Sequence, residues 1–323
     1  MECFIHIGTE KTGSTAIQNF LYDNFSKFKR NNIFLSKALG HENNLGLPYI
    51  VSSRTNENNI LEFEDGDLDK RKLTTDKIEK LFKKELKKNT LEKAIFTSEH
   101  LHSYLKSEES KQYLLSYLSK NGFTKFKIIL FLRPALELRV SRVSTALKLG
   151  GLKNSKLPSL NENLDTLPNL YQSKKTFLSW AKVFGGENII LKKYDKDFDV
   201  IDNFMQFFDV DDDISKYKRR EKSNQSLSFE HIKAFLDNEK FLQGFSNEKI
   251  SRLVYESSKK FKSSNTNVFC PSEDLMKKWD EHFRDDIEHF QDFFEIDLSN
   301  LKEVRDQKIN SELYSDVSNF IRS

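Results

Sequence analysis

Short apolar runs alternate with amphipathic stretches along the first two thirds of the chain. The runs carry strand character, and the stretches between them place apolar residues three and four positions apart, as a helix requires. Strands that alternate with helices predict an α/β fold, with a parallel sheet flanked by helices on both faces. The predicted strands are residues 2–7, 32–36, 93–98, 126–132 and 188–193, and the predicted helices are 14–29, 74–89, 107–120, 134–149, 169–184 and 197–208.

The last part of the chain shows helical periodicity only. No linker rich in Pro, Gly or Ser separates it from the rest. We therefore predict a single domain overall, with an α/β core over residues 1–225 and a helical C-terminal extension over 226–323 packed on that core. One apolar helix face, which we interpret as core packing, is formed by Met276, Trp279, Phe283, Ile287, Phe290 and Phe294.

Two polar segments, residues 37–70 and 150–168, contain few apolar residues and flank the motifs described below. Long irregular segments in a compact domain are often lids or substrate-binding loops. An ordinary surface loop remains the alternative for each of them.

The first strand leads into a helix through a turn that contains glycine. Phe4 to Ile7 form an apolar run, Gly8 ends it, and the residues from Lys11 to Thr15 lead directly into helical periodicity. Backbone N–H groups and the positive end of a helix dipole converge at such a turn, and a lysine adds a full charge. The pattern predicts a phosphate-binding loop; a tight turn with a chance lysine is the alternative.

The order of residues in this loop differs from that of ATP- and GTP-binding loops. Those read G-x-x-x-x-G-K-[ST], whereas here the lysine stands two positions before the second glycine. The order resembles the loop that grips the 5′-phosphosulfate of 3′-phosphoadenosine-5′-phosphosulfate (PAPS) in sulfotransferases. The resemblance implies that this end of PAPS is bound by Lys11, Thr12, Gly13, Ser14 and Thr15.

A second motif follows the predicted strand 126–132. Arg133 ends this strand, Pro134 is placed to begin a helix, and Ser141 follows about two turns along it on nearly the same face. The Arg-x7-Ser pattern resembles the sulfotransferase motif for the 3′-phosphate of PAPS. It implies that Arg133 is a bidentate phosphate ligand and that Ser141 donates a hydroxyl. For Arg133 alone, a salt bridge at the end of a strand is the alternative.

Looser similarity extends over roughly residues 2–235. Three further segments resemble parts of bacterial, carbohydrate-type, PAPS-dependent sulfotransferases: residues 92–101, 188–194 and 223–228. The first of these segments contains Ser98-Glu99. The resemblance implies a three-layer fold of the P-loop type. The C-terminal part lacks the Asn-rich tail motif expected of that family, so acceptor contacts there stay open.

The resemblance implies transfer of a sulfuryl group to a hydroxyl or amine, in a carbohydrate or glycoconjugate. Lys11 then stabilises the leaving nucleotide. Glu99 is the first candidate for the general base and His41 the second; His100 is a further possibility, and a salt bridge is the alternative role of Glu99. We expect no metal, because Arg133 stands where a kinase carries an acidic residue. The competing functions are a P-loop nucleotide kinase or NTPase, and a non-catalytic nucleotide-binding protein.

Composition narrows the class of partners. The 52 basic and 49 acidic residues give a net charge of +3, which argues against a general nucleic-acid-binding protein. The basic cluster 216–222 is either a solvated surface or a source of extra phosphate contacts. Two cysteines and the absence of long apolar runs lead us to expect a cytoplasmic protein without a signal peptide or membrane insertion. Acceptor identity and oligomeric state stay open.

Overall fold

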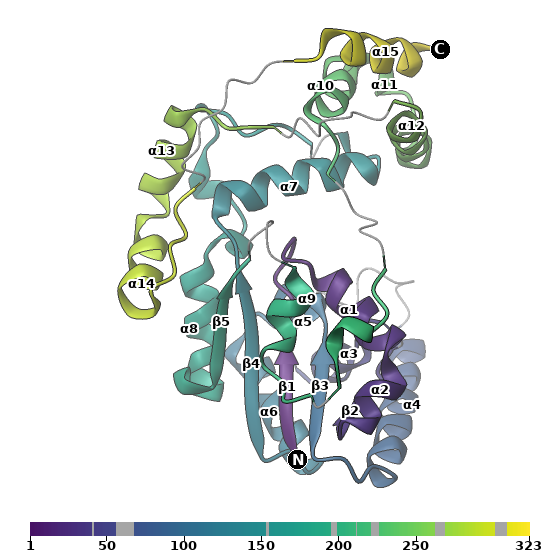
Figure 1. Cartoon of the computed structure of the whole chain (residues 1–323), viewed down its shortest axis with the longest axis vertical. Helices are drawn as coiled ribbons and strands as arrows, with labels where there is room; N and C mark the ends of the chain where they lie inside the picture. The colour runs from purple at the N-terminus through teal and green to yellow at the C-terminus, as the bar shows by residue number, and fades with distance from the viewer. Residues whose placement is uncertain are drawn as a thin grey trace. The chain divides into compact units, whose positions relative to one another are not determined.

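The chain forms two compact units (Figure 1). The structure, a computed structural model, describes residues 1–40, 42–55, 68–152, 155–194, 199–210, 212–220, 226–261, 269–300 and 309–323. The first unit comprises residues 1–133 and 168–221, and the second comprises 134–167 and 222–323. Residues 134–167 thus belong with the C-terminal helices, whereas the sequence analysis assigned them to the α/β core.

A five-stranded sheet lies at the centre of the first unit, and every pairing in it is parallel. The strand order is β2-β3-β1-β4-β5, so β1 lies in the middle between β3 and β4. This confirms the predicted α/β class with a parallel sheet. The strands are β1 (Glu2–His6), β2 (Ile33–Phe34), β3 (Lys93–Thr97), β4 (Lys125–Leu132) and β5 (Ile189–Lys193).

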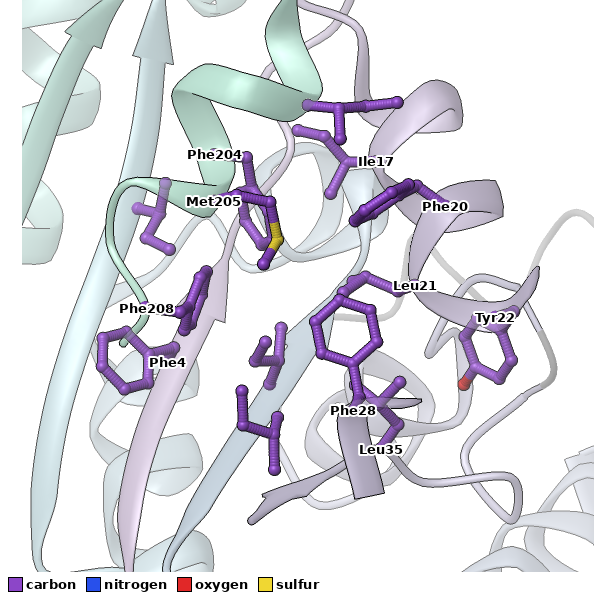
Figure 2. Close-up of a cluster of buried hydrophobic side chains, with 14 of the residues drawn as sticks. Phe4, Ile17, Phe20, Leu21, Tyr22, Phe28, Leu35, Phe204, Met205 and Phe208 are labelled. Atoms are coloured by element: carbon purple, nitrogen blue, oxygen red, sulfur yellow. The ribbon is translucent and has the colours of Figure 1, made fainter. Parts of the chain in front are cut away.

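Aromatic side chains cover one face of the sheet. Phe4 of β1 packs against Phe208, with ring centroids 4.7 Å apart, and belongs to the cluster in Figure 2. The same cluster contains Ile17 of α1 (Ser14–Asp23) and Phe204 of α9 (Val200–Met205). Each such side chain contributes roughly 1.5–3 kcal/mol when it is fully buried. The cluster therefore fixes α1, and with it the preceding loop, against the sheet.

Other aromatic residues point to the opposite face, because neighbouring strand residues alternate in direction. Phe96 of β3 packs against Phe82 of α4 (Leu68–Lys87), with centroids 5.8 Å apart. Phe126 of β4 packs at 5.8 Å against Phe184 of α8 (Ser173–Phe184). Helices therefore cover both faces. The first unit also contains α2 (Phe25–Arg30), α3 (Gly46–Ser52), α5 (Glu99–Tyr104), α6 (Glu108–Lys120) and the 3₁₀ turns η4 (Asn169–Tyr171), η5 (Gly186–Asn188) and η6 (Ile214–Lys216).

The helix predicted over residues 14–29 is wrong in one respect, because it is broken at Asn24 into α1 and α2. The Asn24 side chain donates to the carbonyl of Phe20 at 2.9 Å and to that of Lys218 at 2.8 Å, and its Oδ1 accepts from the Lys218 N–H. A contact with a segment far along the chain thus interrupts a periodicity that is continuous in sequence.

The second unit is helical. Buried Val143 and Leu147 of α7 (Ala135–Lys148) share one apolar cluster with Phe235, Val254 and Val317. Those three residues lie on three different helices, so the cluster joins these helices to α7. The other elements are η3 (Leu164–Thr166), α10 (Phe229–Asp237), α11 (Glu239–Leu242), α12 (Asn247–Lys260), α13 (Glu273–His282), α14 (Arg284–Phe294) and α15 (Ser311–Arg322).

The apolar face predicted from Met276 to Phe294 is shared between two helices. α13 and α14 are separated at Phe283, whose φ of −98° and ψ of 20° end the first helix. The predicted loop 37–70 contains α3 in its described part, and α5 was also not predicted. Within the described ranges, no helix is both long enough and apolar enough to cross a membrane.

One buried histidine, His6, and one partly buried histidine, His102, should make stability sensitive to acid. The His6 Nδ1 is hydrogen-bonded to Thr97 Oγ1 at 2.8 Å, and the His102 Nε2 lies 3.3 Å from Thr176 Oγ1. Burial lowers the pKa of His6 from 6.5 to about 3. Burial, followed by the charges of Lys111 and Lys106, lowers the pKa of His102 to about 4.

Between pH 6.5 and these lowered values, the unfolded chain binds protons that the folded chain does not. The free energy of unfolding should therefore fall as the pH drops below 6.5, by up to ~1.4 kcal/mol per pH unit for each histidine. We expect denaturant titrations between pH 7 and 4.5 to show this decline, with a shallower slope for His102→Gln. An unchanged slope in that variant would contradict the assignment.

Candidate functional site

The backbone between β1 and α1 forms a tight loop with several left-handed residues. Gly8, Lys11 and Gly13 have φ angles of 58°, 63° and 83°. Gly13 precedes α1 as its N-cap, and its carbonyl accepts hydrogen bonds from the N–H groups of Ala16 and Ile17. Within the described part of the chain, the N–H groups of residues 11–15 have no assigned acceptor. Consecutive donors of this kind, at the positive end of a helix, form an anion-binding nest.

Hydroxyl groups hold the loop in this shape. Thr12 Oγ1 donates to the Thr9 carbonyl at 2.6 Å, and Ser14 Oγ donates to the same carbonyl at 3.4 Å. Thr9 Oγ1 in turn donates to the carbonyl of Phe131 on β4. Thr12 is 1% exposed and Ser14 4%. Their hydroxyls therefore support the loop, and its backbone N–H groups are the donors left for an anion.

Arg133 lies at the end of β4 and reaches the same loop. Its side chain is buried, and its Nη1 donates to the carbonyl of Lys11 at 2.7 Å. Its guanidinium carbon lies 5.1 Å from the centre of the Tyr194 ring, a cation–π arrangement. The alternative of a salt bridge at this position is not tested by these contacts and stays a prediction. Two basic residues, Lys11 and Arg133, thus meet at the carboxyl edge of the sheet.

Glu99 comes to this edge from the other side of β1. It is the first residue of α5, whose N-cap is Ser98, and the Ser98 N–H donates to the carbonyl of His6 at 3.2 Å. A Cβ added to Gly8 would lie 2.8 Å from the Glu99 Cα. The loop therefore passes directly over the start of α5, which only a glycine at position 8 permits.

The charges of Arg133 and Glu99 act on Lys11. Burial lowers the pKa of Lys11, the charge of Arg133 lowers it further, and the charge of Glu99 raises it. No hydrogen bond or ion pair of Lys11 Nζ is found among the described residues. A partly buried ammonium beside a guanidinium favours the arrival of an anion, because the anion relieves the repulsion between the two cations.

A substitution at Gly8 should separate backbone strain from steric overlap. An alanine there has φ near +58° and a Cβ 2.8 Å from the Glu99 Cα and 2.9 Å from the Glu99 N. Strain alone costs ~1 kcal/mol or more, and overpacking adds ~1–3 kcal/mol. We expect Gly8→Ala to lower the free energy of unfolding by more than Gly122→Ala, measured by urea denaturation. Gly122 is a matched control because its φ is +93° and its added Cβ has no atom within 4 Å; equal losses would contradict the close approach.

The structure brings together three of the predicted site residues, Lys11, Glu99 and Arg133, and it places Thr12 and Gly13 in the same loop and Ser14 and Thr15 in the first turn of α1. Ser141 lies on α7 in the second unit, and its pairing with Arg133 stays a prediction. His41 lies outside the described residues. Thr15 is exposed at the start of α1.

His100, the further possibility for the base, stacks on Tyr104 with ring centroids 4.8 Å apart, and burial lowers its pKa.

The described part of the basic cluster 216–220 is engaged in ion pairs. Arg220 contacts Asp23 at 2.7 Å and Glu42 at 2.9 Å, and Arg219 pairs with Asp199 and Asp202. Lys216 and Lys218 lie near Asp213 and Asp23. These pairs tie the segment to its surroundings, which supports its interpretation as a surface and not as a phosphate site.

Two residues that contact the loop or Arg133 were not predicted as part of the site. Tyr194, directly after β5, lies beside Arg133, and Thr9 links the loop to β4. An aromatic residue at the end of a strand next to β4 is a signal that the sequence carries for Tyr194. No such signal marks Thr9, because its contact depends on the path of the loop.

Among the described residues, no group of three or more His, Cys, Asp or Glu side chains is arranged to hold a metal ion. Comparisons with protein-family models, curated proteins and solved structures found no match. The geometry of the site therefore carries the functional argument.

Proposed function

We propose that this protein is a PAPS-dependent sulfotransferase with a P-loop-type core. It would move the sulfuryl group of PAPS to a hydroxyl or amine of an acceptor, in a carbohydrate or glycoconjugate. The observation that carries the proposal is the meeting of an open N–H nest, Lys11 and Arg133 at one edge of the parallel sheet. Ligands bind at this edge in open α/β folds.

The residues fit a nucleotide with an anionic group at each end. The nest and Lys11 suit the 5′-phosphosulfate, because unpaired N–H groups and a lysine favour concentrated negative charge. A guanidinium has five N–H donors and binds phosphate through two of them, so Arg133 suits the 3′-phosphate. Bound PAPS supplies an activated sulfuryl group whose bond to the phosphate oxygen breaks during transfer.

Each site residue then has a separate task. Lys11 and the N–H groups of Gly13, Ser14 and Thr15 stabilise the negative charge that develops on the leaving phosphate oxygen. Glu99 accepts the proton of the acceptor hydroxyl, because it begins α5 close to the loop. In this proposal Lys11 and the backbone N–H groups supply the positive charge, so no step uses a metal ion.

The test is a thermal-shift comparison of nucleotides. 3′-Phosphoadenosine-5′-phosphate, the product nucleotide, should stabilise the protein by ~2.7 kcal/mol at 100 times its Kd, and more than ADP at equal concentration. Stronger stabilisation by ATP with Mg²⁺ would contradict the proposal and favour a nucleotide kinase or NTPase. Binding of the product nucleotide with no transfer from labelled PAPS to any glycan in a lysate would indicate a non-catalytic protein.

A further inference from the structure

Arg133 makes a contact that phosphate binding does not require. Its Nη1 donates to the backbone carbonyl of Lys11, 122 positions earlier in the chain, at 2.7 Å. The guanidinium also lies against the ring of Tyr194, and the Tyr194 N–H donates to the carbonyl of Leu132 at 2.6 Å. The guanidinium therefore contacts Tyr194, at the end of β5, and also donates a hydrogen bond to the loop that follows β1.

The residue that accepts this hydrogen bond has an unusual backbone. Lys11 has a φ of 63°, and the other non-glycine residues with positive φ in the described ranges are Asn32 and Glu295. The left-handed conformation is unfavourable for a residue with a long side chain, and it persists only where surrounding contacts impose it. The bond from Arg133 is such a contact, made by a charged donor to the carbonyl of the strained residue itself.

We propose that Arg133 is a positioning residue for Lys11. Its hydrogen bond, with Tyr194 behind the guanidinium, keeps Lys11 left-handed and so presents the lysine and the nest to the 5′ end of the nucleotide. This inference rests on the proposed function. As a consequence, Arg133 should affect the binding of both ends of the nucleotide, the 3′-phosphate directly and the 5′ end through Lys11. The pKa of Lys11 is lowered first by burial and then by the charge of Arg133, and the second effect is in keeping with this proximity.

The first test uses a nucleotide that has no 3′-phosphate. Adenosine 5′-phosphosulfate offers Arg133 no 3′-phosphate to bind, so a replacement of Arg133 would leave its affinity unchanged if the residue served only the 3′-phosphate. We expect Arg133→Gln to weaken adenosine 5′-phosphosulfate about tenfold or more in calorimetric titration, the range for a lost hydrogen bond to a charged group. Tyr194→Leu should weaken it less than Arg133→Gln does, and Tyr194→Phe, which keeps the ring, should weaken it less than Tyr194→Leu. Unchanged affinity in Arg133→Gln would overturn the inference.

The second test needs no ligand. Glycine adopts a φ of +63° without help from surrounding contacts. In a Lys11→Gly background, the stability of the fold should therefore depend less on the hydrogen bond from Arg133. We expect Arg133→Gln to lower the Tm by less in that background than in the wild type, and equal losses would also overturn the inference. If the wild type binds neither adenosine 5′-phosphosulfate nor 3′-phosphoadenosine-5′-phosphate, the proposed function fails. This double-mutant comparison would still decide whether Arg133 positions Lys11.

Discussion

Replacing Lys11 with methionine is expected to lower the rate of sulfuryl transfer about 10²–10³-fold, the usual effect of removing one preorganised charge-stabilising donor. Methionine keeps the length of the side chain but removes the ammonium. The ammonium is close enough to Arg133 to feel its charge, and partial burial lowers the pKa of the ammonium and strengthens its interaction with an anion. Because the charge on the leaving oxygen grows during the reaction, kcat should fall more than nucleotide affinity.

Lys84→Met is a matched control for this variant, because Lys84 is exposed on α4. It should leave kcat unchanged. Single-turnover kinetics with labelled PAPS separate chemistry from nucleotide binding. A Lys11→Met variant with full kcat would show that the lysine does not act on the leaving group.

Glu99→Gln is expected to lower transfer about 10²–10⁴-fold, the range for removal of a general base. The substitution keeps size and hydrogen-bonding capacity but removes the group that accepts the proton. Because Glu99 begins α5 and lies on the opposite side of the loop from β4, the affinity for 3′-phosphoadenosine-5′-phosphate should change little. The measurement is the rate of transfer at saturating PAPS.

Glu92→Gln is the control, since Glu92 is exposed just before the start of β3, at the opposite end of that strand. Full activity in Glu99→Gln, combined with a large loss in His41→Ala, would move the role of general base to His41. Loss of nucleotide binding together with activity would instead assign Glu99 to support of the loop.

The parallel sheet and the gathering of Lys11, Glu99 and Arg133 at one edge were predictable from the sequence. Buried strands read as continuous apolar runs, and the residue after each run must lie at the carboxyl edge of a parallel sheet. Each of these three residues follows such a run, so their meeting depends on strand order alone. The tight turn between β1 and α1 was predictable because glycine there ends an apolar run before helical periodicity, whereas its binding of phosphate stays a prediction.

Contacts between distant segments were not predictable. The break at Asn24 arises from a bond to Lys218, and the apolar pattern of the surrounding helix gives no sign of it. The hydrogen bond from Arg133 to the Lys11 carbonyl depends on the left-handed φ of Lys11, which nothing in the residue type indicates. The ion pairs of Arg219 and Arg220 likewise join residues far apart in the chain.

The most direct measurement is a crystal structure of the protein with 3′-phosphoadenosine-5′-phosphate. The account predicts the 5′-phosphate on Lys11 and the N–H groups of residues 13–15, and the 3′-phosphate on the guanidinium of Arg133. A nucleotide bound elsewhere, or one whose 3′-phosphate lies away from Arg133 while the guanidinium still holds the Lys11 carbonyl, would contradict it.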